Sequence, residues 1–232
     1  MLKLTIAIPS YKEEENLRVI LPKLVSVLNR TELSYEILII DTLNPMDETK
    51  ILCASFGHHV RYLNREGKNN YYGDAIRTGV AKTEGEYLIF MDADGSHDPE
   101  FIAQLYKYKD EFDVVIASRY IKGGSTKNSK ISVLMSLAVN LIYSLVLNLN
   151  CKDVSNSFKL YKSKDIKNIN LASNNFEIVE EILFKLKKKN KNLKIKELPF
   201  TFNERMFGKT KRNLLIFMLT YIYTLVKLRL SK

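Results

Sequence analysis

Short apolar runs alternate with amphipathic stretches through the first half of the 232-residue chain, and this order leaves few folds open. The apolar runs are rich in β-branched side chains, as buried strands are; they lie at residues 5–8, 36–40, 60–63, 87–91 and 114–117. The stretches between them repeat with the helical period; they lie at residues 14–28, 47–54, 72–81 and 99–108. Strand and helix in alternation predict an α/β fold with a mostly parallel central sheet flanked by helices.

The carboxyl ends of the predicted strands indicate where a ligand would bind. In open parallel sheets, ligands lie beyond these ends, because the loops there converge on one edge of the sheet. The four loops in question begin at Pro9, Asp41, Asp92 and Ser118. We therefore expect the functional residues in these loops.

Charge divides the chain into an acidic part and a basic part. Residues 1–115 carry 13 Lys and Arg against 19 Asp and Glu, whereas residues 116–232 carry 23 against 7. Coulomb attraction suits the first part to a metal ion with a nucleotide, and the second to a phosphate-bearing or anionic-surface partner. The lysine run at 185–196 is typical of a solvated helix end, with lipid or nucleic-acid binding as the alternative.

Composition and the N-terminus predict a cytoplasmic protein with one core. The hydrophobic and charged fractions, 46% and 27%, are those of a globular chain long enough to bury one sizeable core. Cys53 and Cys151 have neither metal-ligand spacing nor a pairing pattern, which indicates a reducing compartment. The first ten residues lack the cleavage site of a signal peptide and predict a strand instead.

Residues 131–149 form a long uncharged stretch in the second half. Its polar members recur every four residues, which draws a polar stripe along a helix; they are Ser132, Ser136, Asn140, Ser144 and Asn148. We expect this helix to lie on a membrane or against the domain, and a transmembrane span is the alternative at this length.

A second apolar stretch, residues 214–226, is too short to cross about 30 Å of hydrocarbon. Basic residues flank it on both sides, as in helices that lie on anionic lipid; they are Lys209, Lys211, Arg212, Lys227, Arg229 and Lys232. The pattern predicts an interfacial helix, and a C-terminal helix that closes the core is the alternative.

Two carboxylates follow the predicted strand at 87–91. Asp92 and Asp94 stand one residue apart where the chain leaves the sheet, so their side chains point the same way. Carboxylate oxygens in this arrangement suit Mg²⁺ or Mn²⁺, which water and substrate phosphates usually complete. Acidic residues are common after strands, so the pair alone does not establish a metal site. The motifs around it support that interpretation.

Three motifs in order resemble those of family 2 glycosyltransferases, whose fold is the nucleotide-diphospho-sugar transferase (GT-A) type. They are residues 9–16 (PSYKEEEN), residues 91–99 (MDADGSHDP), and residues 118–120 (SRY) with the glycine pair at 123–124. A fourth motif, residues 197–211 (ELPFTFNERMFGKTK), resembles the dolichol-phosphate mannosyltransferase and polyprenyl-phosphate hexosyltransferase group. The resemblance covers residues 3–212.

For the nucleotide, the resemblance implies that Pro9, Tyr11 and Glu13 line the pocket and that Asp41 contacts the base or the ribose. The first three also have purely structural interpretations: a proline that ends a strand, a tyrosine that packs and a glutamate that begins a helix. Lys68 is implied as a diphosphate contact. The chain departs from the family pattern here, with one Asp where the family usually has two and a longer loop around Lys68.

For the sugar diphosphate, the resemblance implies that Asp92, Ala93 and Asp94 hold both the diphosphate and the metal. Ser96 stands where the group often has Gln as a further metal ligand, and it is the third candidate ligand. His97 beside it is more typical of a hydrogen-bonded turn residue than of a ligand. Arg119 is implied to lie near the phosphates or the sugar.

The acceptor is predicted from what the sequence lacks as well as from what it contains. A sugar hydroxyl needs a general base, and no convincing equivalent of the family's base motif is present. A phosphate monoester is already ionised and needs only cations that hold it in line with the anomeric carbon. Arg205 and Lys211, on either side of Gly208, suit that role, and a solvated basic loop is the structural alternative. Gly208 is expected to let this loop move and order on substrate binding.

We predict one catalytic domain at residues 1–212, with a nucleotide-sugar part at 1–120 and an acceptor part at 121–212, followed by the interfacial helix at 213–232. The predicted reaction moves a hexose, with inversion and with Mg²⁺ or Mn²⁺, from a nucleoside diphosphate sugar of the GDP-mannose or UDP-glucose type to a polyprenyl phosphate. The enzyme is expected on the cytoplasmic face of the membrane, bound to an anionic lipid surface. The residues assigned to catalysis are Asp94, Arg119, Arg205 and Lys211.

Two other functions remain open at this point. In one, the acceptor is a hydroxyl of a cell-surface glycan, and Asp153, Glu177 or Glu180 is the base. In the other, the chain is a non-catalytic module that binds a nucleotide or a nucleic acid. The lysine-rich half lacks the interleaved aromatic residues of nucleic-acid modules, so nucleic acid is not the expected partner.

Overall fold

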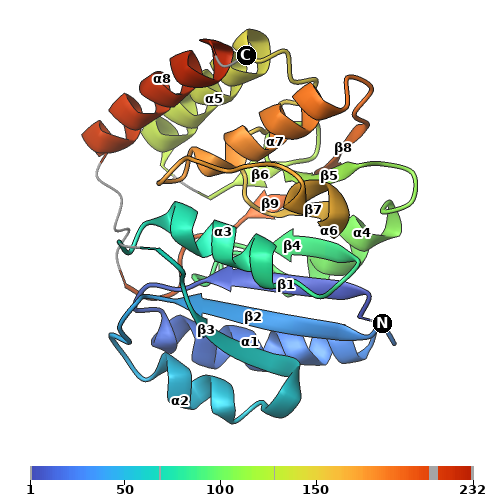
Figure 1. The fold of residues 1–232 in the computed structure, drawn as a ribbon, viewed down its shortest axis with the longest axis vertical. Helices are drawn as coiled ribbons and strands as arrows, with labels where there is room; N and C mark the ends of the chain where they lie inside the picture. Colours follow the sequence, from blue (N-terminus) through green and yellow to red (C-terminus); the bar gives the residue numbers. More distant parts are fainter. Residues whose placement is uncertain (1, 68, 128, 209–213, 231–232) are drawn as a thin grey trace.

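The computed structural model describes residues 2–67, 69–127, 129–208 and 214–230, and it shows a seven-stranded sheet with helices on both faces (Figure 1). The strand order is β3-β2-β1-β4-β7-β5-β8, and the strands pair in parallel except where β7 runs antiparallel to β4 and β5. The strands are β1 (Leu4–Pro9), β2 (Tyr35–Asp41), β3 (Val60–Asn64), β4 (Tyr87–Phe90), β5 (Val114–Ser118), β7 (Lys159–Lys162) and β8 (Ile195–Pro199). A small second sheet pairs β6 (Ser125–Thr126) with β9 (Thr201–Phe202).

The core lies in two layers because successive strand residues point to opposite faces of the sheet. In β1, Leu4, Ile6 and Ile8 pack on one face and Ala7 packs on the other. The first face is covered by α1 (Glu14–Asn29), α2 (Thr49–Ala54) and α4 (Ile102–Lys107). The second is covered by α3 (Tyr72–Lys82), α6 (Ser163–Lys167) and α7 (Ile178–Lys189).

The predicted α/β fold is confirmed, and each strand predicted in the first half is present. The helix predicted at 99–108 is divided into a short 3-10 turn, η2 (Pro99–Phe101), and α4. Another 3-10 turn, η1 (Gly57–His59), leads into β3. The predicted boundary between residues 212 and 213 lies outside the described residues, so the division of the chain there stays a prediction.

The helix α5 (Lys130–Val146) turns the middle of the predicted polar stripe inward: Ser136 and Ser144 are half-buried and Asn140 is buried, whereas Ser132 is exposed. Asn140 is 1% exposed, and its Nδ2 donates to the Ser136 carbonyl at 2.7 Å and to Ser155 Oγ at 3.0 Å. The Ser155 N–H donates back to Asn140 Oδ1 at 2.9 Å. Apolar side chains point away from the domain; the exposed ones are Ile131, Leu134, Leu137, Leu141, Ile142, Leu145 and Val146. This helix therefore packs on the domain through Asn140 and Tyr143 and leaves most of its large apolar side chains exposed, unlike a usual amphipathic helix.

The C-terminal helix α8 (Leu214–Leu230) lies beside α5 (Figure 1). The Tyr143 hydroxyl donates to the Tyr221 carbonyl at 2.6 Å, and Tyr221 and Leu228 join the core. The opposite side of α8 stays exposed, with Ile222, Tyr223, Val226 and Leu230. α8 thus packs on the domain and also presents an apolar side. Across the described ranges, no helix combines the length and apolar character needed to cross a membrane.

Two ionisable side chains are buried under these helices. Burial raises the pKa of Glu180, on α7, to about 8, against the attraction of the nearby Lys159 ammonium. Burial lowers the pKa of Lys159, in β7, to about 8. The Lys159 ammonium donates to the carbonyl oxygens of Val154 and Asn156. The proton on Glu180 therefore links folding to pH.

The Glu180→Gln variant should show this link. The wild-type folded state keeps a proton that the unfolded state releases above the ordinary carboxyl pKa, so wild-type stability falls as pH rises toward 8. The variant lacks this loss, and its advantage in free energy of unfolding should grow by up to about 1.4 kcal/mol per pH unit between pH 5 and 7. Urea unfolding across this range measures the difference. A difference that does not change with pH would contradict the prediction, and the surface variant Glu111→Gln serves as the control.

Candidate active site

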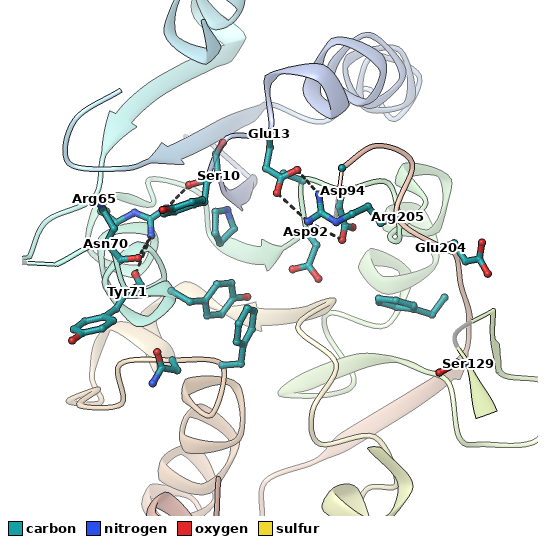
Figure 2. Close-up of a pocket in the computed structure, with 18 residues that line it drawn as sticks. Ser10, Glu13, Arg65, Asn70, Tyr71, Asp92, Asp94, Ser129, Glu204 and Arg205 are labelled. Carbon is teal, nitrogen blue, oxygen red and sulfur yellow. Dashed lines mark hydrogen bonds and ion pairs between the residues drawn. The ribbon is translucent and has the colours of Figure 1, made fainter. Parts of the chain in front are cut away.

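A cavity of about 800 Å³ opens at the carboxyl edge of the sheet (Figure 2). Its lining comes from the loops after β1, β3 and β4, from the start of α3, and from the segments before α5, α7 and α8. Chain segments far apart in the sequence therefore meet here, as the parallel topology predicts. The predicted site residues that line the cavity are Pro9, Tyr11, Glu13, Asp92, Ala93, Asp94 and Arg205.

Arg65 ties together the loops on the β1–β3 side of the cavity. It is 3% exposed, and its Nε donates to the Asp41 carbonyl at 3.0 Å. One Nη donates to the carbonyls of Asn70 and Tyr71 at 3.0 and 3.1 Å, and the other donates to the Ser10 carbonyl. Burial lowers the pKa of Arg65, and the charge of Asp41 opposes this shift. Sequence reasoning did not single out this side chain, although it opens the same loop as Lys68.

Asp41, which was predicted to contact the base or the ribose, does not line the cavity. It is fully buried, and the Tyr62 hydroxyl donates to its Oδ2 at 2.9 Å while the Thr42 N–H donates to its Oδ1 at 2.8 Å. Burial raises the pKa of Asp41 against these hydrogen bonds. Asp41 supports the loop after β2 in this structure, and its contact with a nucleotide stays a prediction.

Asp92 is held through both its backbone and its side chain. Its N–H donates to His97 Nδ1 at 3.0 Å, and Ser157 Oγ donates to its Oδ1 at 3.0 Å. The His97 ring is buried, stacks on Phe158 at a centroid distance of 4.6 Å, and pairs through Nε2 with Asn156 Oδ1 at 3.1 Å. Burial lowers the pKa of His97, so the ring is neutral and Nδ1 accepts. The structure thus confirms His97 as a hydrogen-bonded turn residue.

Asp94 is oriented by Ser96. The Ser96 hydroxyl and N–H both donate to Asp94 Oδ1, at 2.6 and 3.0 Å. The turn between them requires Gly95, which has a φ of +85° and whose Cβ, if present, would lie 2.6 Å from the Met206 side chain. Ser96 is buried and does not line the cavity, so its hydroxyl serves Asp94 here. Its role as a metal ligand stays a prediction.

Arg205 forms a charged contact across the cavity (Figure 2). Its guanidinium donates twice to the Glu13 carboxylate, at 2.7 and 3.0 Å, and lies 3.5 Å from Asp94 Oδ2. Burial alone would lower the pKa of Arg205, but the hydrogen bonds to Glu13 and the charges of Asp94 and Glu13 raise it. A cation is therefore fixed between two carboxylates.

Two hydrogen bonds hold the segment around Arg205, one to the loop after β4 and one to α1. The Met206 N–H donates to the Asp94 carbonyl at 2.9 Å, and the Phe207 N–H donates to Asn16 Oδ1 at 3.0 Å. Gly208 has a φ of +77°, which favours glycine. The expectation that this loop moves and orders around a substrate stays a prediction.

Arg119 lies behind the lining of the cavity rather than in it. Its Nε and Nη2 donate to the Asp153 carboxylate at 2.9 and 2.7 Å, and Nη2 also donates to Ser155 Oγ at 2.9 Å. Its guanidinium carbon lies 5.4 Å from the centroid of the Phe202 ring, which does line the cavity. Contact between Arg119 and a phosphate or sugar stays a prediction.

The remaining predicted residues are not brought into the cavity by the described part of the chain. Lys68 and Lys211, predicted to contact the diphosphate and the acceptor, lie outside the described residues. The three carboxylates considered as a base do not line the cavity, and each is more than nine-tenths buried; they are Asp153, Glu177 and Glu180.

Asp92 and Asp94 are the residues placed to hold a divalent cation. Both line the cavity, and their side chains are 29% and 20% exposed. Over the ranges that the structure describes, no group of three or more His, Cys, Asp and Glu is arranged as a metal site. Two carboxylates with an open cavity in front fit an ion that phosphate oxygens and water complete, as is usual for Mg²⁺.

The fold and the cavity together define an α/β protein with paired carboxylates at a ligand site on the carboxyl edge of its sheet. Residues 5–169 match glycosyl transferase family 2, and the chain belongs to this family. It is therefore a glycosyltransferase.

Two relatives are named as lipid-phosphate mannosyltransferases. The chain is 32% identical to the dolichol-phosphate mannosyltransferase of Pyrococcus furiosus over 97% of its own length, and it spans 64% of that relative. It is 29% identical to the undecaprenyl-phosphate mannosyltransferase of Micrococcus luteus, over 88% of this chain and 85% of the relative.

A solved structure shares the fold. The glucosyl-3-phosphoglycerate synthase of Mycobacterium tuberculosis, in complex with Mn²⁺, UDP and phosphoglyceric acid, matches all of this chain and 80% of its own with a TM-score of 0.73. Identity is 17%, so the likeness concerns the fold alone. It confirms the GT-A type.

Replacing Asp94 by Asn tests the metal assignment with little change in shape, because the amide oxygen can still accept from Ser96. Mn²⁺ should increase the thermal stabilisation of the wild-type chain by UDP or GDP, since a ligand that binds only the folded state stabilises it. The variant should need about tenfold more Mn²⁺ or should lose the response. Melting temperatures with and without Mn²⁺ measure this effect. Glu111→Gln removes an exposed carboxylate outside the cavity and should behave like wild type, and an unchanged Mn²⁺ response in Asp94→Asn would rule the assignment out.

Proposed function

We propose that this glycosyltransferase moves a hexose from a nucleoside diphosphate sugar, of the GDP-mannose or UDP-glucose type, to a polyprenyl phosphate. The transfer depends on Mg²⁺ or Mn²⁺ and inverts the anomeric carbon. The observation that carries the proposal is a single cavity that holds two accessible carboxylates, Asp92 and Asp94, beside the fixed cation of Arg205. The names of the Pyrococcus furiosus and Micrococcus luteus relatives support the same acceptor class.

The donor diphosphate is assigned to the end of β4. Asp92 and Asp94 would hold the divalent ion there, and a bound ion neutralises the diphosphate as it becomes the leaving group. Ser157 and Ser96 already donate to these two carboxylates, so little reorganisation is needed when charge develops. The nucleoside then extends toward Tyr11 and the loops after β1 and β3.

An acceptor that is already ionised is supported by the positions of Asp153, Glu177 and Glu180, which were considered as a base but are buried and do not line the cavity. Of the four carboxylates that do line it, Asp92 and Asp94 face the proposed metal, Arg205 binds Glu13, and Glu204 stands exposed in the segment before α8. A phosphate oxygen can attack the anomeric carbon without losing a proton. The bond from that carbon to the diphosphate breaks as the new bond forms on the opposite side, which gives inversion.

Arg205 is proposed to hold the acceptor phosphate. Its planar guanidinium matches two phosphate oxygens, and it lies 3.5 Å from Asp94 Oδ2, beside the proposed position of the leaving group. The acceptor phosphate would take the place of Glu13 as its partner. Lys211, six residues along the chain, is proposed as a second cation for the acceptor phosphate. Arg119, whose guanidinium lies over the Phe202 ring, is proposed to support that ring in the lining of the cavity.

Transfer assays with two acceptor classes test this proposal. We expect the wild-type chain to prefer undecaprenyl or dolichyl phosphate over free glycans. Arg205→Ala should reduce transfer to the lipid phosphate by about a hundredfold, because a charge-assisted contact to the phosphate is lost, and Arg205→Lys should retain part of the activity.

The matched control is Arg30→Ala, which removes an exposed arginine that pairs with Glu100 outside the cavity. A preference for glycan hydroxyls, with a rate that requires a basic group in the free enzyme, would reject the lipid acceptor and favour the glycan alternative.

We further propose that the apolar side of α5 and α8 rests on the cytoplasmic face of an anionic membrane. The two helices lie side by side and expose a row of large apolar side chains, which marks a docking surface. Lys130, Lys227 and Arg229 are exposed at the ends of the same helices, where anionic headgroups would attract them. Ser129, which caps α5, also lines the cavity, so one end of the apolar surface reaches the site.

Leu134→Asp tests the membrane surface, and Ile51→Asp is its control. Both positions are highly exposed, at 70% and 69%, but Ile51 lies on α2, away from α5 and α8. Binding to phosphatidylcholine vesicles that contain phosphatidylglycerol should weaken about tenfold or more for Leu134→Asp and stay unchanged for Ile51→Asp. Co-sedimentation measures this. Equal effects of the two substitutions would count against the proposal.

A further inference from the structure

The residues that precede β7 lie beside the residues that follow β4, because these two strands run antiparallel to each other. Ile89 pairs with Leu160 in the ladder, and Phe90 forms a further bridge with Phe158. The two residues before Phe158 are Asn156 and Ser157, which are 2% and 8% exposed. Two polar side chains are therefore buried directly behind the carboxylates at the end of β4.

Ser157 holds one oxygen of the Asp92 carboxylate. Its hydroxyl donates to Asp92 Oδ1 at 3.0 Å. The second carboxylate is held in the same way, since the Ser96 hydroxyl and N–H donate to Asp94 Oδ1, and its Oδ2 lies 3.5 Å from the Arg205 guanidinium. In each aspartate, a serine thus binds Oδ1 and leaves Oδ2 as the oxygen for a cation.

Asn156 determines which nitrogen of the buried His97 ring carries the hydrogen. The Asn156 amide nitrogen donates to the Ala117 carbonyl at 2.5 Å, and its Oδ1 accepts from the Phe158 N–H at 3.2 Å. This Oδ1 also lies 3.1 Å from His97 Nε2, so Nε2 is the nitrogen that donates. The other nitrogen, Nδ1, therefore has a lone pair, which accepts from the Asp92 N–H at 3.0 Å.

The N–H of the His97 ring has a second acceptor close by. Asp92 Oδ2 lies 3.8 Å from His97 Nε2, whereas Asn156 Oδ1 lies 3.1 Å from it. A separation of 3.8 Å is too long for a hydrogen bond, so the ring leaves Oδ2 unbound in this structure. A buried N–H without a partner is unfavourable. Without Asn156, the ring would therefore turn its N–H to Oδ2 and occupy the oxygen that a cation needs.

We propose that Asn156 and Ser157 are positioning residues for Asp92. Ser157 fixes Oδ1, while Asn156 keeps the His97 N–H away from Oδ2, so that Oδ2 stays open to a divalent cation. The inference rests on the proposed function, because it takes Asp92 as a ligand of the metal ion. Neither residue lines the cavity, and both lie outside the four motifs that resemble the family. Hydrogen-bond partners of this kind orient metal ligands, and their loss typically lowers metal affinity about 10- to 100-fold.

Thermal unfolding at increasing Mn²⁺ tests the role of Ser157. Wild type, Ser157→Ala and Ser157→Thr are heated with a fixed concentration of UDP or GDP, and the Mn²⁺ concentration that gives half of the stabilisation is compared. Ser157→Ala should need about tenfold more Mn²⁺, whereas Ser157→Thr keeps the hydroxyl and should stay near wild type. Ser163→Ala is the matched control, because Ser163 is also buried and its hydroxyl has no hydrogen-bond partner among the described residues.

The variant Asn156→Leu removes the acceptor of the ring N–H with little change in size. Heteronuclear NMR of the ring nitrogens in the metal-free chain should show wild-type His97 with its hydrogen on Nε2 and none on Nδ1. In the variant, the Nε2 signal should shift as its hydrogen bond moves to Asp92, and about tenfold more Mn²⁺ should be required. Asn140→Leu is the control, since it removes another buried amide whose hydrogen bonds go to Ser136 and Ser155.

Melting temperatures without Mn²⁺ show whether each variant is folded, and Ser157→Ala with its threonine counterpart carries the test if Asn156→Leu is not. An unchanged Mn²⁺ requirement in either folded variant would overturn the inference. An equal rise in Asn140→Leu would also overturn it, because the effect would then be a general loosening of the segment before β7. If wild type shows no response to Mn²⁺, the metal assignment fails together with this inference. A chain that responds to Mn²⁺ as expected but transfers no hexose to a lipid phosphate loses only the proposed acceptor.

Discussion

The buried guanidinium of Arg65 is the constraint on which the β1–β3 side of the cavity depends. It donates to backbone carbonyls after β1, at the last residue of β2 and before α3. These carbonyls converge at the carboxyl edge of the sheet, where their partial negative charges would otherwise face one another. Each such charge-assisted hydrogen bond contributes about 1.5–3 kcal/mol. One side chain therefore sets the spacing of the segments that carry Ser10, Asn70 and Tyr71.

Local pattern explains how much of the fold could be predicted from the sequence. The strands β1, β2, β4 and β5 are largely apolar and buried, as the sequence pattern predicts, whereas β3 lies at the edge of the sheet and is mostly half-buried. β7 has no such signal: it begins with the buried Lys159 and pairs antiparallel between β4 and β5, which depends on partners distant in the sequence. The polar stripe of α5 could also be predicted from the sequence. The inward orientation of Asn140 depends on hydrogen bonds with Ser155, a residue outside the helix.

For the site, too, sequence motifs predicted some residues, whereas the contacts of others became known only from the structure. The triplet at 92–94 and Arg205 line the cavity as their motifs predicted, because strand ends and loops of a parallel sheet converge. Motif position did not reveal that Arg119 pairs with Asp153 or that Asp41 is covered by Tyr62, because such partners are set by packing. The structure alone shows that His97 accepts from the Asp92 N–H and that Ser157 donates to the Asp92 carboxylate.

A backbone hydrogen bond joins Gly73, at the start of α3, to Asn174, in the loop before α7. The next two residues of that loop, Asn175 and Phe176, line the cavity. The N–H to carbonyl distance in this contact is 2.7 Å, and both partners are main-chain atoms, so the contact does not involve the side chains at positions 175 and 176. The backbone contact that holds the loop and the side chains that line the cavity are therefore independent of each other. Substitutions at positions 175 and 176 can therefore change the lining of the cavity while the contact between this loop and α3 stays in place.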